Sequence, residues 1–262
     1  MFAGSLVAIV TPMHVDGAID FEAWTRLLEF HVANGTAGIV VGGTTGESAT
    51  LRDAELRELL LRACQLLQGR MTVIAGAGTS STASTIERVA WLSELPIDAL
   101  LLYNVPTRTA IDMKPATVAR LAHVAGIVGI KEAVAQTERV RELVAGCPAG
   151  FVVLSGDDAT ARAAVAAGAR GVISVTANVA PRAMSQMLAA ALRGDAARAA
   201  DLDEPLGALH RELFVETNPI PVKWLLAHMG LIGPGIRLPL TPLAAEHHAG
   251  LLAAARAAGP LA

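Results

Sequence analysis

Short apolar runs rich in β-branched residues alternate with helical patterns over the first two thirds of the chain, and this alternation predicts an α/β protein. The runs are nearly continuously apolar, as in parallel strands buried on both faces, so a βα-barrel or a doubly wound sheet is indicated. After Val175 only helical patterns follow. We therefore expect a TIM-type βα-barrel over residues 1–194 and a C-terminal helical appendage over residues 195–262. No linker rich in Gly and Ser separates the two, so the appendage should pack on the barrel.

Seven runs qualify as strands of the barrel. A closed barrel of this kind has eight strands, so the barrel is expected to have seven strands in place of eight. The predicted strands are residues 5–10, 38–42, 72–75, 99–103, 127–131, 151–154 and 171–175.

The clearest helix covers residues 53–68, where leucines and an alanine recur on one face and Gly69 can end the helix. In the C-terminal region, Pro and Gly clusters around residues 218–221 and 233–235 break the helical pattern. The further predicted helices are residues 181–193, 195–213, 222–228 and 243–257.

Composition excludes several classes of protein. The chain has 262 residues, 53% of them hydrophobic, yet no apolar run reaches the roughly 18 residues of a membrane span. A net charge of −3 gives no electrostatic basis for binding nucleic acid or an anionic membrane. Two cysteines build no disulfide framework, and the seven histidines show no metal-ligand spacing, so no metal site is expected. Residues 1–10 lack a basic segment and resemble a strand more than a signal peptide, which predicts a cytoplasmic protein.

Lys131 is the most informative single residue. Only three of the 21 basic residues are lysines, and this one ends a predicted core strand. Desolvation can leave a lysine amine neutral, and a neutral amine can attack a carbonyl to form a Schiff base. The alternative is a structural lysine that reaches the strand end and pairs with Glu132.

Two loops that follow predicted strands carry polar groups, and in βα-barrels such loops form the active-site face. Glycines flank Thr44 and Thr45, and the amides and hydroxyls of this turn suit a carboxylate; alternatively, Thr44 and Glu47 form a capping box. Tyr103, the single tyrosine, ends a strand where its hydroxyl can act as acid or base. Arg108 can hold a second carboxylate in bidentate fashion, or it is an exposed arginine in a proline turn. A further segment, residues 155–158, is interpreted as a helix cap.

In this order these segments resemble the dihydrodipicolinate synthase family, lyases of the class I aldolase type in the βα-barrel superfamily that includes N-acetylneuraminate lyase. The matching stretches span most of the chain: residues 4–13, 43–51, 103–109, 129–133, 154–159, 171–181 and 218–224.

The resemblance implies that the protein condenses pyruvate with aspartate-4-semialdehyde to 4-hydroxy-tetrahydrodipicolinate, in lysine and diaminopimelate biosynthesis. Lys131 would form a covalent imine with pyruvate, and no cofactor would be needed. Tyr103 and Thr44 would belong to a proton relay, and Thr44 and Thr45 would hold the pyruvate carboxylate. Arg108 would bind the aldehyde substrate, and the carbonyl of Ile173 would face the site. The family also implies a homo-oligomer, a dimer or tetramer.

One departure from the family is large. Members have a further strand that ends in Thr-Pro-Tyr-Tyr, followed by a helix, whereas residues 92–98 of this chain lead directly into the strand that ends at Tyr103. About 30 residues, one βα unit, are missing. In the family a tyrosine of this unit reaches the neighbouring subunit's site and completes the relay, so turnover and the dimer are both in question. Two alternatives stay open: a pyruvate-dependent class I aldolase that acts on a sugar acid, and a non-catalytic relic of the barrel.

Overall fold

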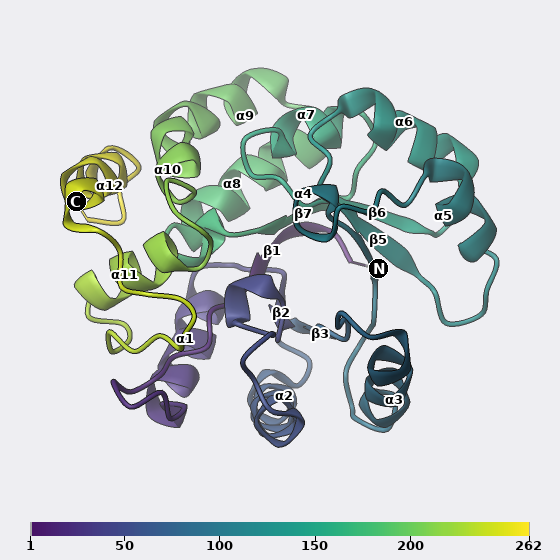
Figure 1. Cartoon of the computed structure of the whole chain (residues 1–262). Coiled ribbons are helices and arrows are strands. Elements are labelled where there is room, and N and C mark those ends of the chain that lie inside the picture. The colour runs from purple at the N-terminus through teal and green to yellow at the C-terminus, as the bar shows by residue number, and fades with distance from the viewer. Residues whose placement is uncertain (1, 262) are drawn as a thin grey trace.

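The computed structural model describes residues 2–261 and contains one curled sheet of seven parallel strands (Figure 1). The strand order is β3-β2-β1-β7-β6-β5-β4, which confirms the predicted seven-stranded barrel architecture. The strands are β1 (Gly4–Ala8), β2 (Gly38–Val41), β3 (Thr72–Ala75), β4 (Leu102–Asn104), β5 (Gly129–Glu132), β6 (Val152–Ser155) and β7 (Gly171–Ser174).

Successive strand residues face opposite sides of the sheet, and both sides are apolar. Leu6, Leu154 and Ile173 belong to a small cluster built from strand residues and chain segments without helices, so they lie inside the curl. Val7 and Val172 face the other way and join the large hydrophobic cluster formed with the helices. This arrangement explains why the strands appear in the sequence as continuous apolar runs.

The edge strand β3 contacts the segment just before the other edge strand, β4. Ile74 forms a single parallel bridge with Ala99, and the Asp98 amide donates to the Val73 carbonyl at 2.9 Å. The predicted strand over residues 99–103 is therefore divided: its start contacts β3, whereas its end, β4, pairs with β5. Because the sheet has one βα unit fewer, the single segment 99–104 contacts β3 at its start and β5 at its end.

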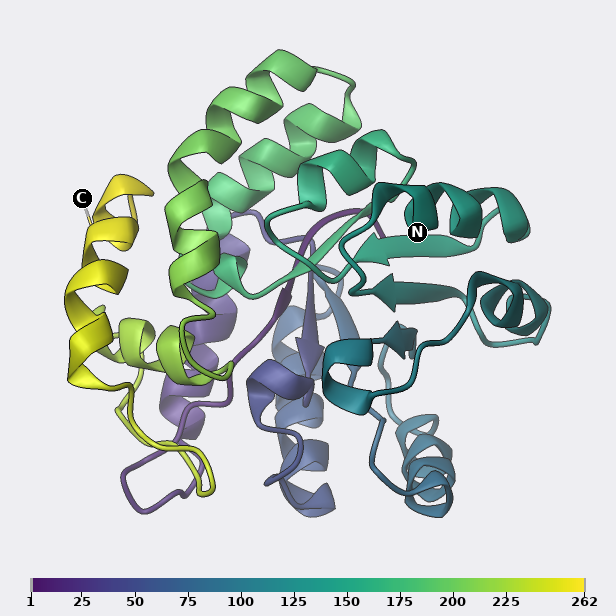
Figure 2. The ribbon, with the colours of Figure 1, turned by 45° about the horizontal axis from the view of Figure 1, so that its top comes forward.

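Helices surround the sheet (Figures 1 and 2). The helices are α1 (Phe21–Ala33), α2 (Asp53–Leu67), α3 (Thr82–Leu92), α4 (Pro106–Thr109), α5 (Pro115–Leu121), α6 (Thr137–Gly146), α7 (Ala161–Ala166) and α8 (Pro181–Leu192), with the short 3₁₀ helices η1 (Thr44–Gly46) and η2 (Thr176–Asn178). Of these helices, α2 and α8 match the predicted helices over residues 53–68 and 181–193 to within one residue at each end.

The C-terminal region is helical, as expected, but the predicted helix over residues 195–213 is broken. Pro205 lacks an amide N–H, and the chain passes through a 3₁₀ turn before the next helix. Leu209 and Leu225 of this region share one hydrophobic cluster with Val7 of β1, so the helices pack on the barrel. The elements are α9 (Ala196–Asp203), η3 (Glu204–Leu206), α10 (Gly207–Glu212), α11 (Ile220–His228) and α12 (Ala245–Ala257).

Within residues 2–261, no helix has the length and apolar character needed to cross a bilayer. The same residues contain no group of three or more His, Cys, Asp or Glu side chains placed to hold a metal ion. Cys64 and Cys147 are free and half-buried.

Candidate active site

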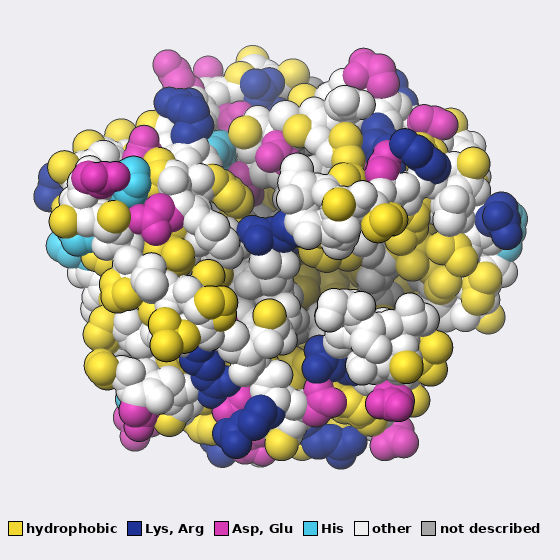
Figure 3. Space-filling view, viewed as in Figure 1, with side chains coloured by type: hydrophobic (Ala, Val, Ile, Leu, Met, Phe, Trp, Pro, Cys, Tyr) yellow, Lys and Arg dark blue, Asp and Glu magenta, His cyan; other side chains and the backbone are white. Residues whose placement is uncertain are grey.

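The segments predicted to carry the chemistry follow the carboxyl ends of the strands. The 3₁₀ helix η1 follows β2, and α4 follows β4. Both lie at the front of the view in Figure 1, at the same end of the sheet. The space-filling view of this face shows a hollow near its middle, with hydrophobic side chains gathered to its right (Figure 3).

Lys131 lies on β5 directly opposite Tyr103 of β4. In a parallel pair, residues in register point to the same side of the sheet. The Lys131 Nζ atom lies 4.6 Å from the centroid of the Tyr103 ring, which is cation–π distance. Leu154, the partner of Lys131 on β6, belongs to the cluster inside the curl, so the amine enters the barrel interior.

The interpretation of Lys131 as the ion-pair partner of Glu132 is wrong. Glu132 is the next residue along the strand, so its side chain points to the other face of the sheet. There its carboxylate accepts from Arg139 Nε at 2.8 Å and from Asn104 Nδ2 at 2.9 Å. Among residues 2–261, Lys131 is the one lysine without a carboxylate partner, since Lys114 pairs with Asp112 and Lys223 with Glu47.

Gly156, just after β6, leaves the space that the Lys131 side chain occupies. A Cβ atom added at this glycine would lie 3.0 Å from Lys131 Cε and 2.9 Å from Ala133 Cβ. Both contacts are shorter than ordinary van der Waals separations. The Lys131 side chain can therefore adopt this conformation because residue 156 has no side chain.

Tyr103 is 38% exposed because β4 is an edge strand. Its hydroxyl makes no hydrogen bond to any other group in residues 2–261, Thr44 included; the relay partners Tyr103 and Thr44 are thus not joined in this structure. The ring contact with the Lys131 amine is the interaction that places Tyr103 beside the predicted nucleophile.

Thr44 and Thr45 form the start of η1, whose first amides have no acceptor within the helix. Thr44 is half-buried and Thr45 is buried. Among residues 2–261, no acceptor is found for the Thr44 and Thr45 amides, and these two amides and the two hydroxyls are donors of the kind that a carboxylate needs. The groups present at this turn are therefore compatible with the predicted carboxylate site.

The capping-box interpretation of Thr44 and Glu47 is wrong. Glu47 ends η1 in the left-handed region, with φ of 59°, and its side chain points into the protein. Its carboxylate pairs with the buried Lys223 amine and also accepts from the Arg237 amide at 3.0 Å. At the start of α2, Glu55 accepts from the Arg52 amide at 2.9 Å, which is one half of a capping box.

Sequence reasoning missed the residues from the C-terminal region that hold the Thr44–Gly46 turn. Lys223 of α11 is buried against Glu47, and burial lowers the pKa of Lys223 although the attraction of Glu47 opposes this change. Asn218, on the segment before α11, donates from Nδ2 to the Thr45 hydroxyl at 2.9 Å. More than 170 residues separate the members of each pair, so no local pattern signals the contacts.

Arg108 is exposed on α4 and forms no ion pair within residues 2–261. Two hydrogen bonds hold the loop that follows α4. Asn104 of β4 accepts from the Met113 amide at 2.9 Å, and Arg139 of α6 donates to Asp112 at 2.7 Å. Hydrogen bonds from Lys114, Asn104 and Arg139 lower the pKa of Asp112 to about 2, so its carboxylate stays charged at neutral pH.

Ile173 is buried on β7, inside the curl and paired with Leu6. The interpretation of residues 155–158 as a helix cap is wrong, because α7 begins at Ala161 and its N-cap residue, Thr160, makes no side-chain cap hydrogen bond. Asp157 accepts from the Thr160 amide at 2.9 Å, before the helix begins. Asp158 instead accepts from the amides of Val175 and Thr176, both at 2.9 Å, and so connects the end of β6 to the loop after β7.

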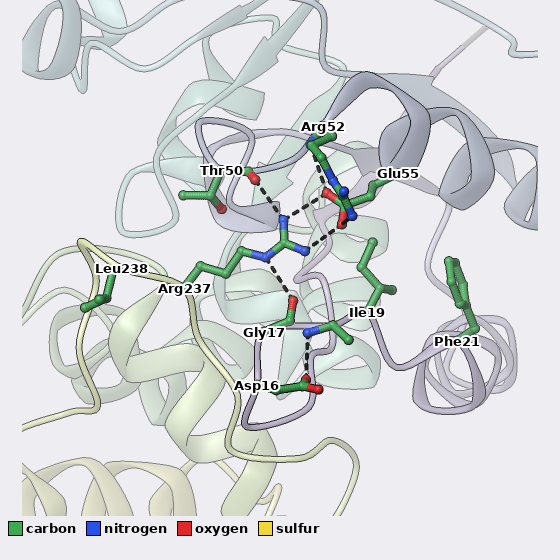
Figure 4. Close-up of a pocket in the computed structure, with 10 residues that line it drawn as sticks. Asp16, Gly17, Ile19, Phe21, Thr50, Arg52, Glu55, Arg237 and Leu238 are labelled. Carbon is green, nitrogen blue, oxygen red and sulfur yellow. Dashed lines mark hydrogen bonds and ion pairs between the residues drawn. The ribbon is translucent and has the colours of Figure 1, made fainter.

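A cavity of about 730 Å³ is shown in Figure 4, and its lining does not include Lys131, Tyr103 or Thr44. Arg237 crosses it and donates to the Gly17 and Thr50 carbonyls and to both oxygens of Glu55. The hydrogen bonds from Arg237 hold the pKa of Glu55 well below its usual range. All three nitrogens of the guanidinium donate hydrogen bonds within the protein. Arg237 therefore connects the C-terminal region to the barrel at this cavity.

Comparison with known proteins gives one consistent result. The sequence model of the Dihydrodipicolinate synthetase family matches residues 1–102 and 94–258. A 4-hydroxy-tetrahydrodipicolinate synthase of Methylococcus capsulatus is 48% identical, with 100% of both chains covered. That alignment extends over 291 positions, whereas this chain has 262 residues, a difference the size of the missing βα unit.

Solved structures agree with the sequence relatives. A chloride-inhibited dihydrodipicolinate synthase from Acinetobacter baumannii, solved with pyruvate, is 40% identical and has a TM-score of 0.96, with 99% of each chain covered. A monomeric dihydrodipicolinate synthase variant is 34% identical and has a TM-score of 0.95, with coverage of 99% of this chain and 98% of the variant. Sequence and fold along the whole chain thus lead to the same conclusion: this chain, although shorter by one βα unit, belongs to the dihydrodipicolinate synthetase family.

Proposed function

We propose that this protein is a Schiff-base lyase that condenses pyruvate with aspartate-4-semialdehyde to give 4-hydroxy-tetrahydrodipicolinate. The observation that carries the proposal is the placement of Lys131: an amine without a carboxylate partner in residues 2–261, inside the barrel and against the Tyr103 ring. Family membership supports the same reaction class.

Covalent bonding through Lys131 accounts for the chemistry without a metal or an organic cofactor. The Lys131 amine attacks the keto carbon of pyruvate, and loss of a proton and of water gives an imine. Loss of a methyl proton gives the enamine, whose carbon attacks the aldehyde of the second substrate. The amino group of that substrate then attacks the imine carbon, which closes the ring and releases Lys131 as a free amine.

Two carboxylates need separate anion sites. The amides and hydroxyls of Thr44 and Thr45 bind the pyruvate carboxylate, and Arg108 binds the carboxylate of the semialdehyde. The Ile173 carbonyl lines the site on the β7 side. Tyr103 moves protons during imine formation and ring closure, with Thr44 as its partner once substrate is bound.

Borohydride reduction with pyruvate tests the proposal. We expect a stable adduct, located by mass spectrometry on the peptide that carries Lys131. Lys131→Arg is the matched variant, because it keeps the positive charge but cannot form the imine, and it should give no adduct. A folded wild-type protein that gives no adduct would contradict the enzyme proposal and leave the non-catalytic alternative.

The aldehyde substrate is tested separately. Consumption of aspartate-4-semialdehyde is compared with pyruvate release from a panel of sugar acids. We expect the first reaction to be faster; the reverse order would favour the sugar-acid lyase. The loop around Arg108 supports the first reaction, since it offers a guanidinium to a second carboxylate.

Assembly and location belong to the same proposal. We expect a cytoplasmic homo-oligomer, a dimer or tetramer, although the missing unit is the one that the family uses at its tight dimer. A monomeric variant among the similar structures is a precedent for the fold without that contact. Sedimentation of the purified protein distinguishes the oligomer from a monomer.

A further inference from the structure

We propose that Asn218 is a positioning residue that orients the Thr45 hydroxyl as a hydrogen-bond donor toward the carboxylate of the keto-acid substrate. The inference rests on the proposed function and adds a residue from the C-terminal region to the anion site. Asn218 and Thr45 are both buried, with 5% and 2% of their surface exposed. The Asn218 Nδ2 atom donates to Thr45 Oγ1 at 2.9 Å.

The chemistry of the hydroxyl makes this contact directional. A threonine hydroxyl has one proton to donate and two lone pairs to accept. Because the Asn218 amide group fills one lone pair, the Thr45 proton stays available and points away from Asn218. A bound carboxylate has only acceptor oxygens, so it requires this orientation.

The turn itself is held independently of Asn218. Glu47, two residues after Thr45, is anchored by the Lys223 amine and by the Arg237 amide. With the backbone of the turn fixed by these contacts, the rotation of the Thr45 side chain is the remaining freedom that Asn218 restricts. The Asn218 Oδ1 atom has no hydrogen-bond partner in residues 2–261, so the Nδ2 contact is the one this side chain makes.

Asn218→Asp distinguishes positioning from a general structural role. At neutral pH the introduced carboxylate only accepts, so it takes the Thr45 proton and faces the substrate with negative charge. We expect the pyruvate concentration for half-maximal borohydride labelling to rise about tenfold or more at pH 8. The maximal labelling at saturating pyruvate should stay at the wild-type level. As the pH falls and the introduced carboxyl group becomes protonated, it can donate again, and the defect relative to wild type should shrink.

Matched variants serve as controls. Asn178→Asp makes the same chemical change at another buried asparagine, which contacts the Ala8 carbonyl and not the threonine turn. It should show no pH-dependent change in half-saturation. In a Thr45→Val background, Asn218→Asp should add no pH-dependent defect, because the hydroxyl that it redirects is absent.

Several outcomes would overturn the inference. Half-saturation equal to wild type across pH 5–8 is one, and a pH-independent loss of maximal labelling, as a misfolded protein gives, is another. If Asn218→Asp does not fold, Asn218→Ala takes its place: a raised half-saturation with full maximal labelling supports the role, and wild-type half-saturation overturns it. Absence of labelling in the wild-type protein refutes the proposed function itself; labelled wild type with an unaffected variant refutes only this inference.

Discussion

At the scale of single residues, Lys223 is buried and Lys131 is half-buried, and their surroundings separate them. Lys223 is 4% exposed, and its amine forms an ion pair with the Glu47 carboxylate. This ion pair offsets the cost of removing the charged amine from water. Lys131 contacts an aromatic ring instead of a carboxylate. An amine that lies beside an aromatic ring and has no carboxylate partner in residues 2–261 is suited to attack a carbonyl, whereas an amine held in an ion pair is not.

Gly156→Ala tests how closely the lysine is packed. The added methyl group would lie 3.0 Å from Lys131 Cε, so the side chain must move. We expect the rate of pyruvate labelling to fall about tenfold, since a misplacement near 1 Å costs up to about 10² in rate. Gly126→Ala is not a suitable control because Gly126 has a positive φ; Gly78→Ala meets no atom within 4 Å and should label normally. Normal labelling in Gly156→Ala would show that the lysine tolerates displacement.

The Tyr103→Phe variant distinguishes formation of the pyruvate imine from formation of the final product. The phenyl ring keeps the contact with the amine but loses the hydroxyl, so the pyruvate adduct should still form at saturation. Product formation should fall about 10²-fold, the usual contribution of a positioned acid or base. The measurement is the ratio of labelling to product formation. An equal loss of both would place the role of Tyr103 in imine formation alone.

At the scale of elements, α1 carries a buried histidine that links stability to pH. Burial lowers the pKa of His31 to about 3, whereas an unfolded chain has a histidine pKa near 6.5. Below pH 6.5 the unfolded state therefore binds a proton that the folded state does not. His31 should destabilise the fold by up to about 1.4 kcal/mol per pH unit as the pH falls from 6.5 toward 3.

Urea unfolding at pH 7, 6 and 5 measures this slope. His31→Gln should make the decline in the free energy of unfolding shallower, and His123→Gln, at an exposed histidine, should leave it unchanged. Identical slopes in His31→Gln and wild type would show that His31 is not the responsible group.

The region around β4 shows which features of a strand the local sequence predicts and which it does not. The apolar run at residues 99–103 correctly predicts a strand near Tyr103, but not that Ala99 contacts β3 while Leu102–Asn104 pairs with β5. Apolar periodicity reports burial and carries no information about which strand is the neighbour. The same limit explains Glu47, which fits a local capping motif by spacing yet pairs with Lys223 of α11.

At the scale of the whole molecule, the C-terminal region is joined to the barrel by a buried ion pair. In Lys223→Met the Glu47 carboxylate stays buried without its cation, so we expect a loss of roughly 3–5 kcal/mol in the free energy of unfolding. Lys114→Met breaks an exposed pair with Asp112 and should cost less than about 1 kcal/mol. Chemical denaturation of both variants checks the difference. A similar small loss in both would mean that the buried pair contributes little.

The missing βα unit leaves the barrel with one weak seam, between β3 and the segment just before β4. The Asp98 and Ala75 amides make the two backbone hydrogen bonds of this seam, at 2.9 and 3.4 Å. By contrast, β1 and β7 are each flanked by two paired strands. Hydrogen exchange should therefore be faster at Asp98 and Ala75 than in β1 and β7, because the seam can open without global unfolding. Equal protection at all four places would show that the seven-stranded barrel closes as a single cooperative unit.

The sequence by itself determined the class of fold and the number of strands, and it predicted Lys131, Tyr103, Thr44 and Thr45 as site residues, which remain a proposal. These features are local, since they depend on periodicity, on residue type and on position just after a strand. Only the tertiary structure decided that Glu132 faces away from Lys131, that Ala99, before β4, contacts β3, and that Asn218 and Lys223 hold the Thr44–Gly46 turn. Those contacts join residues that are far apart along the chain or depend on which side of a strand a residue faces, and chain folding alone brings them together.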